Sequence, residues 1–363
     1  MMIFFQVIGI KAHATHSAGA DISYRCLGGL QYELTVTFYR DCGGVAEPAS
    51  IQISCKSVSG SYNFYATANK IALTGEEISL PCSTAVTSCN GGSTTGLRKF
   101  IYKAVVTLPS AEPDWVFSYS LCCRNCSITT ITNPCANIST LYIEATLNNT
   151  IILCNNSPSF SNIPITFVSI GQNFNFNHGA IDTDGDSLSY SLITPRTSAS
   201  SYVNYIAPHN TFNPIISSTP FILNSLTGDI NFTPVQTEIG ILTLLVKEYR
   251  NGQLIGSVIR DMQIYTHPSQ NNLPIASGIN GTNNHNVTLC PGQQICFTVS
   301  TMDLDSSQMV SLTTNYGISN ATYNIINSPH PTLEFCWTPS INDVSSSPKT
   351  FTVTVTDDAC PTK

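Results

Sequence analysis

The chain has 363 residues, a net charge of −7 and 10% charged residues, where an average soluble domain has about 25%. An acidic chain with few basic residues is a poor partner for nucleic acid or for an anionic membrane surface, so both are excluded as expected partners. The hydrophobic share of 42% is enough for packed interiors, and the length predicts two or three domains.

The first 19 residues have the features of an export signal. A short apolar run, MMIFFQVIGI, is followed by Ala12-His13-Ala14, which matches a small-x-small cleavage site. Lys11 follows the apolar run, whereas a basic residue normally precedes it. No run reaches the ~20 apolar residues that span a bilayer. We therefore expect residues 1–19 to be a signal region and the protein to be secreted or displayed on a bacterial cell surface.

Short segments of alternating apolar and polar residues recur along the chain, and a helical period is absent. This alternation is typical of strands with one buried and one wet face. The clearest segments are residues 32–40, 114–122, 141–147, 187–193, 241–249 and 350–358. Clusters of Gly, Pro, Asn and Ser separate them. The predicted fold is therefore all-β, with tandem immunoglobulin-like β-sandwich domains.

Two polar, proline-bearing stretches, residues 155–164 and 267–286, divide the chain. They predict a cysteine-rich domain at 20–155, a second domain at 165–267 and a third at 285–363. The last two are weakly repeated. IDTDGDSLSYSL (181–192) and GDINFTP (228–234) of one correspond to MDLDSSQMVSL (302–312) and LEFCWTP (333–339) of the other.

Fourteen cysteines indicate an oxidising compartment. No cysteine occurs between residues 155 and 289, which suits bridges closed within separate domains. Cys122, Cys123 and Cys126 include a CxxC spacing, but without a second metal-ligand pair this favours disulfides over zinc. If Cys122 and Cys123 lie in a strand, their side chains point to opposite faces, and each is expected to bond a different partner.

Four cysteines fall in the third domain and allow three connectivities. Cys296 and Cys336 lie within alternating strands, and we expect them to join the two sheets. Cys290 and Cys360 flank the first and last strands, which often lie side by side. These two pairs are the preferred disulfide candidates.

The sharpest chemical motif is Asp182-Thr183-Asp184-Gly185-Asp186. Carboxylates at positions i, i+2 and i+4 can converge on one hard cation, and Ca²⁺ takes six to eight oxygens. An EF-hand is rejected, because strands replace the flanking helices and Ile193 stands where the bidentate Glu should be. The alternative is a solvated acidic turn, since Asp and Gly favour turn geometry.

Further Ca²⁺ ligands are expected at the ends of strands. Glu248 closes a late strand and is the best extra candidate for the Asp182, Asp184 and Asp186 site, with Asp229 a weaker one.

The third domain, which repeats the second, has fewer candidate acids for a second Ca²⁺ site. They are Asp303 and Asp305 with Asp357 or Asp358.

No catalytic motif is present, and no catalytic residue and no cofactor other than Ca²⁺ is predicted. Nucleophile elbows, zinc-protease helices and phosphate-binding glycine loops are absent from the sequence. Asp182 and Glu248 could form a glycosidase pair. Their place in a repeated β unit favours a structural role.

Several long motifs in one order carry a family resemblance. They are GADISYRCLGGLQYELTVTFYRDCGG, FSYSLCCRNCSITTITNP, LYIEATLNN, HGAIDTDGDSLSYSL, KEYRNGQLIGSVIRDMQ, FCWTPS and FTVTVTDDACP. The chain resembles the repeats of gliding-motility-associated surface proteins of Gram-negative bacteria that use type IX secretion. Its middle segment is similar to cadherin-like and PKD-like modules. In many of these the acidic loop binds calcium, which the resemblance implies for Asp182, Asp184 and Asp186.

The resemblance also implies a surface or adhesion context. Such proteins usually continue to a C-terminal sorting domain, whereas this chain stops at Thr362-Lys363, so we expect it to be truncated. The expected function is a non-enzymatic, stalk-like adhesion protein whose partners are other surface proteins, a polysaccharide or the substratum. The alternatives are a carbohydrate-binding accessory module of a secreted hydrolase and a hydrolase with an unrecognised carboxylate pair.

Overall fold

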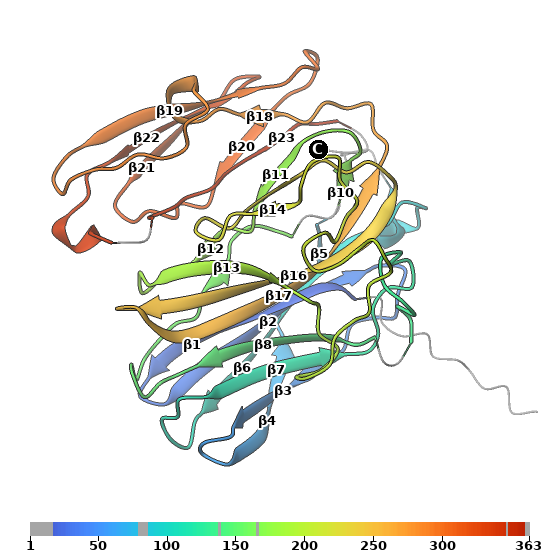
Figure 1. The fold of residues 1–363 in the computed structure, drawn as a ribbon, viewed down its shortest axis with the longest axis vertical. Helices are drawn as coiled ribbons and strands as arrows, with labels where there is room; N and C mark the ends of the chain where they lie inside the picture. Colours follow the sequence, from blue (N-terminus) through green and yellow to red (C-terminus); the bar gives the residue numbers. More distant parts are fainter. Residues whose placement is uncertain (1–16, 79–85, 137–138, 165–166, 346–347, 360–363) are drawn as a thin grey trace, which may run out of the picture.

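The computed structural model describes residues 17–78, 86–136, 139–164, 167–345 and 348–359. Regular structure in these ranges consists of 23 strands and three short 3-10 helices, η1 (Ser88–Asn90), η2 (Ile279–Gly281) and η3 (Ile341–Asp343). The predicted all-β fold is confirmed, with the strands arranged in several sheets (Figure 1). None of the helical segments in these ranges is long and apolar enough to cross a membrane.

The N-terminal unit contains the first eight strands. They are β1 (Ser17–Gly28), β2 (Gln31–Asp41), β3 (Ser50–Ser57), β4 (Tyr62–Lys70), β5 (Glu76–Glu77), β6 (Leu97–Thr107), β7 (Trp115–Leu121) and β8 (Leu141–Leu147). The alternating segments at 32–40, 114–122 and 141–147 thus form β2, β7 and β8. Their apolar faces are buried, because a two-residue period places every second side chain on the same side of a sheet.

The middle unit contains nine strands. They are β9 (Ser159–Phe160), β10 (Phe167–Ser169), β11 (Phe174–Asn177), β12 (Ala180–Ile181), β13 (Ser187–Ile193), β14 (Ile222–Leu223), β15 (Asp229–Phe232), β16 (Glu238–Arg250) and β17 (Gln253–His267). The two long strands β16 and β17 form a hairpin. Its turn is Asn251-Gly252, with φ of 52° and 77°, and Asn-Gly is the preferred pair where both turn residues need positive φ.

Strand β17 joins the first two units. One of its edges pairs with β16 along nearly its whole length, while the other edge is shared by three strands. Along that second edge it pairs in turn with β8, with β1 and, in parallel, with β10. The order β1-β2-β6-β4-β3-β7-β8 is thereby closed into a ring by β17. The predicted boundary at 155–164 lies between two segments that share one sheet.

The hydrophobic core also crosses that boundary. Trp115 and Phe117 of β7 are fully buried in one cluster with Val246 of β16 and Val258 of β17. Tyr62 stacks on Trp115 with 5.5 Å between the ring centres. The N-terminal unit therefore buries its interior against strands that come much later in the chain.

A buried ion pair lies at the same junction. Arg124, just after β7, donates to both carboxylate oxygens of Asp261 on β17, at 2.6 and 2.8 Å. Both side chains are almost completely buried, and the Thr243 hydroxyl donates a further hydrogen bond to Asp261. The neighbouring Arg260 is also buried and donates to the Tyr39 hydroxyl.

The C-terminal unit forms a separate layer, at the end of the molecule away from β3 and β4 (Figure 1). Its strands are β18 (Ile275–Ala276), β19 (Ile295–Met302), β20 (Ser311–Thr314), β21 (Thr322–Ile326), β22 (Thr332–Trp337) and β23 (Val353–Thr356). They make a four-stranded sheet, β18-β19-β22-β21, and a two-stranded sheet, β20-β23. Phe297, Leu333 and Phe335 form its core.

Cys296 and Cys336 are joined by a disulfide. They lie directly opposite each other in β19 and β22, which are neighbours in one sheet, so this bridge does not connect the two sheets as expected. The expected partner of Cys290, Cys360, lies outside the described residues, and that pairing stays a prediction.

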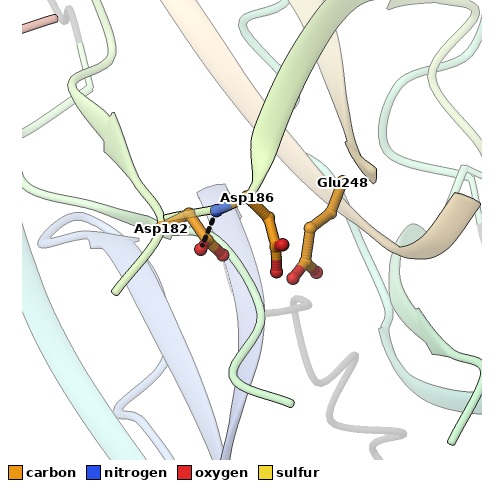
Figure 2. Close-up of side chains that lie close together, drawn as sticks. All are labelled: Asp182, Asp186 and Glu248. Carbon is orange, nitrogen blue, oxygen red and sulfur yellow. Dashed lines mark hydrogen bonds between the residues drawn. The ribbon is translucent and has the colours of Figure 1, made fainter. Parts of the chain in front are cut away.

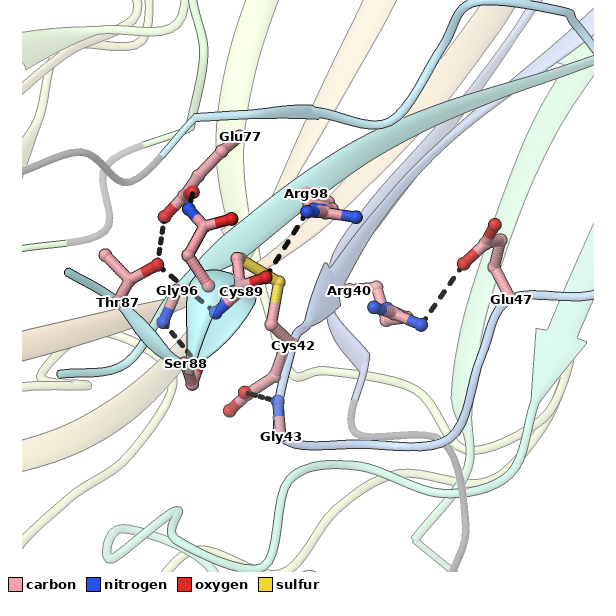
Figure 3. Close-up of a disulfide and its surroundings, with 12 residues drawn as sticks. Arg40, Cys42, Gly43, Glu47, Glu77, Thr87, Ser88, Cys89, Gly96 and Arg98 are labelled. Atoms are coloured by element: carbon pink, nitrogen blue, oxygen red, sulfur yellow. Dashed lines mark hydrogen bonds and ion pairs between the residues drawn. A yellow bond between two sulfur atoms is a disulfide. The ribbon is translucent and has the colours of Figure 1, made fainter. Parts of the chain in front are cut away.

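Among the described residues, four disulfides hold the N-terminal unit: Cys26–Cys154, Cys42–Cys89, Cys122–Cys123 and Cys126–Cys135. The expectation that Cys122 and Cys123 bond different partners is wrong. Strand β7 ends at Leu121, so strand alternation does not govern these two residues. Figure 3 shows Cys42–Cys89, where Arg98 donates to the Cys89 carbonyl.

The Arg124–Asp261 pair gives a stability prediction. Asp261→Asn removes one charge and leaves the Arg124 guanidinium buried without a counter-charge. We expect the free energy of unfolding to fall by about 3–5 kcal/mol in urea denaturation. Glu33→Gln is the control, because Glu33 pairs with the partly exposed Lys103 and its loss should cost less than about 1 kcal/mol. Equal losses in the two variants would contradict the role of the buried pair.

Candidate metal centre

Three of the predicted ligands converge. Asp182 and Asp186 come from the loop between β12 and β13, and Glu248 lies near the end of β16. An oxygen of each lies within 4.8 Å of the others (Figure 2). In the part of the chain that the structure describes, this is the single group of three such side chains close enough to hold a metal ion. The loop and the strand meet because β13 pairs with β16, with Leu188 opposite Glu248.

The acidic loop folds around one carboxylate oxygen. Asp182 Oδ1 accepts the backbone N–H groups of Asp184 at 3.0 Å and Asp186 at 2.8 Å. Gly185 supplies the positive φ of 82° that this tight turn requires. The other oxygen, Oδ2, is buried and accepts no hydrogen bond. The turn therefore occupies Oδ1 of Asp182, while Oδ2 remains available to a ligand of the cluster.

Glu248 is fully buried, and neither of its carboxylate oxygens accepts a hydrogen bond. Its neighbour across the sheet is Gly256 of β17. A Cβ atom at Gly256 would lie 2.8 Å from Glu248 Oε2, 2.6 Å from Tyr24 Oη and 3.0 Å from the Thr146 carbonyl oxygen. Only glycine leaves room for the carboxylate there. A buried carboxylate without partners is costly, so it needs either a proton or a cation.

The negative charges of the clustered carboxylates repel one another. Burial, followed by the charge of Asp182, raises the pKa of Glu248 to about 10. Burial and the charges of Asp186 and Asp184 raise the pKa of Asp182 to about 6. Without a cation the Glu248 carboxyl is therefore protonated at neutral pH. A divalent cation would reverse both shifts, because opposite charge favours the ionised carboxylate.

Asp184 does not join the cluster. Its carboxylate accepts the backbone N–H and the side-chain amide of Asn156, at 2.8 and 2.7 Å. It therefore fastens the acidic loop to the segment that leads into the middle unit. Asp229, the weaker candidate, is occupied by Asn177 and Thr227 and is also outside the cluster.

The donor set fits a hard cation. Carboxylate oxygens are the ligands that Ca²⁺ prefers, and Asp182 and Glu248 both have buried oxygens without a hydrogen-bond partner. Asp182, Asp186 and Glu248 would hold the ion. The sequence did not single out Asn155 and Asn156, although an Asn-Asn pair precedes both repeated units, at 155–156 and at 271–272.

The second predicted site has the same hydrogen-bonding plan. Asp303 Oδ1 accepts the Asp305 N–H at 2.8 Å, as Asp182 does for Asp184. Asp305 accepts the backbone and amide N–H groups of Asn272, as Asp184 does for Asn156. Asp357 accepts the amide of Asn271 at 2.9 Å, and burial raises its pKa.

The second cluster is nevertheless less complete. Asp303 keeps one buried oxygen without a partner, while the oxygens of Asp357 are engaged by Asn271 and by the Ala359 N–H. Asp358 is turned away and accepts the Met309 N–H. Within the described ranges, Asp303, Asp305 and Asp357 do not bring three carboxylates as close together as the first cluster does.

No known protein family and no curated protein matches the chain. Among solved structures, the I-band fragment I67–I69 of titin aligns over 94% of this chain and 94% of that chain, with 10% identity and a TM-score of 0.19. The N-terminal eight immunoglobulin domains of the Down syndrome cell adhesion molecule align over 93% of this chain and 35% of that chain, with 10% identity and a TM-score of 0.18. At these scores the likeness carries no argument about function.

The environment of Glu248 gives a second prediction. A carboxyl whose pKa is raised on folding contributes stability below its unfolded pKa and loses it as pH rises towards the folded value. In chelator at pH 8, Glu248→Gln should therefore raise the free energy of unfolding by at least about 1 kcal/mol relative to wild type. Glu144→Gln is the control, because Glu144 is paired with Arg196 at 2.6 Å and its loss should not stabilise. A destabilised Glu248→Gln would show that the carboxylate is satisfied without a cation.

Proposed function

We propose that this chain is a non-enzymatic extracellular structural protein of the adhesion type, stiffened by Ca²⁺ and by disulfides. The observation that carries the proposal is the buried Glu248 carboxylate without partners beside Asp182 and Asp186. Five disulfides in the described residues support an oxidising, extracellular setting. The family resemblance adds the setting of a gliding-motility-associated bacterial surface, with surface proteins, polysaccharide or substratum as partners.

Calcium would act as a brace between elements that are distant in sequence. Asp182 and Asp186 belong to the β12–β13 loop, whereas Glu248 belongs to the long hairpin that closes the ring. A bound ion supplies the positive charge that lets these carboxylates ionise together. The loop would then be fixed to β16 and, through Asp184 and Asn156, to the segment entering the middle unit. The packed cores do not depend on the ion, so its loss should loosen the loop and leave the sandwiches folded.

The geometry of the Asp182, Asp186 and Glu248 cluster argues against a hydrolase. A glycosidase needs two carboxyl groups that reach a substrate, separated by roughly 5–10 Å. Here Glu248 is fully buried and lies directly against the loop acids. The carbohydrate-module alternative requires a row of exposed aromatic rings on one sheet. In the described residues, the strongly exposed rings of Tyr65, Tyr202, Phe212 and Tyr316 are scattered over β4 and two loops.

Calcium removal gives the test of this proposal. Saturating Ca²⁺ at about 100 times Kd should stabilise the fold by about 2.7 kcal/mol, which raises Tm by several degrees over a chelated sample. Protease cleavage in the 182–186 loop should slow in parallel. With Asp357→Asn present to remove the second cluster, Asp182→Asn should abolish both responses, and Asp229→Asn, at an acid outside the first cluster, should keep them. Identical melting and cleavage with Ca²⁺ and with chelator would refute the calcium brace.

A further inference from the structure

The cluster already contains a positive charge of its own. Nε and Nη2 of Arg250 donate to the two carboxylate oxygens of Asp186, each at 2.5 Å. Nη2 also donates to Asn155 Oδ1 at 3.1 Å and lies 3.4 Å from Asp184 Oδ2. A bidentate guanidinium–carboxylate pair is among the stronger side-chain contacts in proteins. Of the three cluster acids, Asp186 is thus the one that is paired with a cationic side chain.

This guanidinium does not satisfy the rest of the cluster. Glu248 and Asp182 Oδ2 stay without partners although Arg250 is two residues from Glu248 on the same strand. Arg250 ends β16 beside the Asn251-Gly252 turn, and its side chain is 26% exposed. It can therefore turn into solvent without disturbing the core. A divalent ion that takes Asp186 as a ligand competes directly with Arg250 for the same two oxygens.

The C-terminal unit provides an internal comparison. In the aligned repeat, Glu248 corresponds to Asp357 and Arg250 to Ala359. Where Arg250 donates to Asn155, the neutral amide of Gln308 donates to Asn271 Oδ1 at 2.8 Å. The Asn-Asn and acidic-loop arrangement therefore forms there without an arginine. In this repeat Ser307 stands at the position of Asp186, so the arginine and the acid that it holds are absent together, which ties Arg250 to Asp186 rather than to the shape of the loop.

We propose that Arg250 is an internal competitor of the divalent ion at Asp182, Asp186 and Glu248, and that the ion binds only as Arg250 releases Asp186. The inference rests on the calcium brace proposed above and adds how that site is regulated. Release of Asp186 also frees Asn155 Oδ1, an additional oxygen beside the ion. Competition lowers the affinity of the site, so that the brace responds to the high free Ca²⁺ outside cells, where extracellular modules bind in the range of about 10⁻⁴–10⁻³ M.

Calcium calorimetry on the full chain tests this competition. All proteins carry Asp357→Asn, so that the heat reports the first cluster alone. We expect Arg250→Gln to bind Ca²⁺ about tenfold more tightly than its parent, given the strength of charge-assisted hydrogen bonds. Arg250→Lys keeps the charge without the bidentate geometry and should fall between the two. Arg196→Gln removes a comparable pair with Glu144 elsewhere and should leave the affinity unchanged.

The other outcomes separate the two proposals. Calcium binding to the parent that is unchanged or weakened in Arg250→Gln would show that Arg250 positions Asp186 for the ion, which overturns the competition and keeps the brace. Absence of binding in both proteins would overturn both. Melting in chelator verifies that each variant is folded, and Arg250→Lys provides the comparison if Arg250→Gln is not.

Discussion

The structure depends on the hydrogen bonding of β17 along both edges. One edge pairs with β16, and the other completes the ring of the N-terminal unit through β8 and β1. This closure removes exposed strand edges, which are otherwise sites of unwanted pairing. It also explains why residues near 145 and 258 share one core. The N-terminal unit cannot complete its sheet without a strand that is more than a hundred residues later in the chain.

The same closure buries Glu248, the cluster acid that lies on β16. Gly256 of β17 lies between β8 and Glu248 of β16, and only a residue without a side chain fits there. The Glu248 carboxylate is therefore buried, beside the acidic loop and close to the point on Gly256 that Tyr24 Oη and the Thr146 carbonyl also approach. In such surroundings Coulomb interactions are strong, so the proton, Arg250 and a divalent ion are competing ways of balancing the charge. The raised pKa of Glu248 corresponds to balance by a proton, and the Arg250–Asp186 pair to balance by a guanidinium.

The sequence predicted those features that depend on local order. Alternation located β2, β7, β8, β13 and β16, because a two-residue period is a property of each strand alone. The spacing of Asp182 and Asp186 and the strand position of Glu248 were enough to identify three acids that meet. The pairing of β17 with β1 and β8 was not predictable, since it depends on long-range register. Asp184 turns towards Asn156 through a hydrogen bond across 28 residues, which spacing does not reveal. The Cys122–Cys123 bridge was missed because the strand ends one residue earlier than assumed.

Crystallography with Ca²⁺ tests most directly whether the carboxylates of Asp182, Asp186 and Glu248 form a cation site. Crystals of the full chain grown in millimolar Ca²⁺ should show one ion with oxygen ligands of all three residues at about 2.3–2.6 Å, and Arg250 turned away from Asp186. Density that shows no ion, with Arg250 still on Asp186 and Glu248 enclosed as in the cation-free state, would contradict the account.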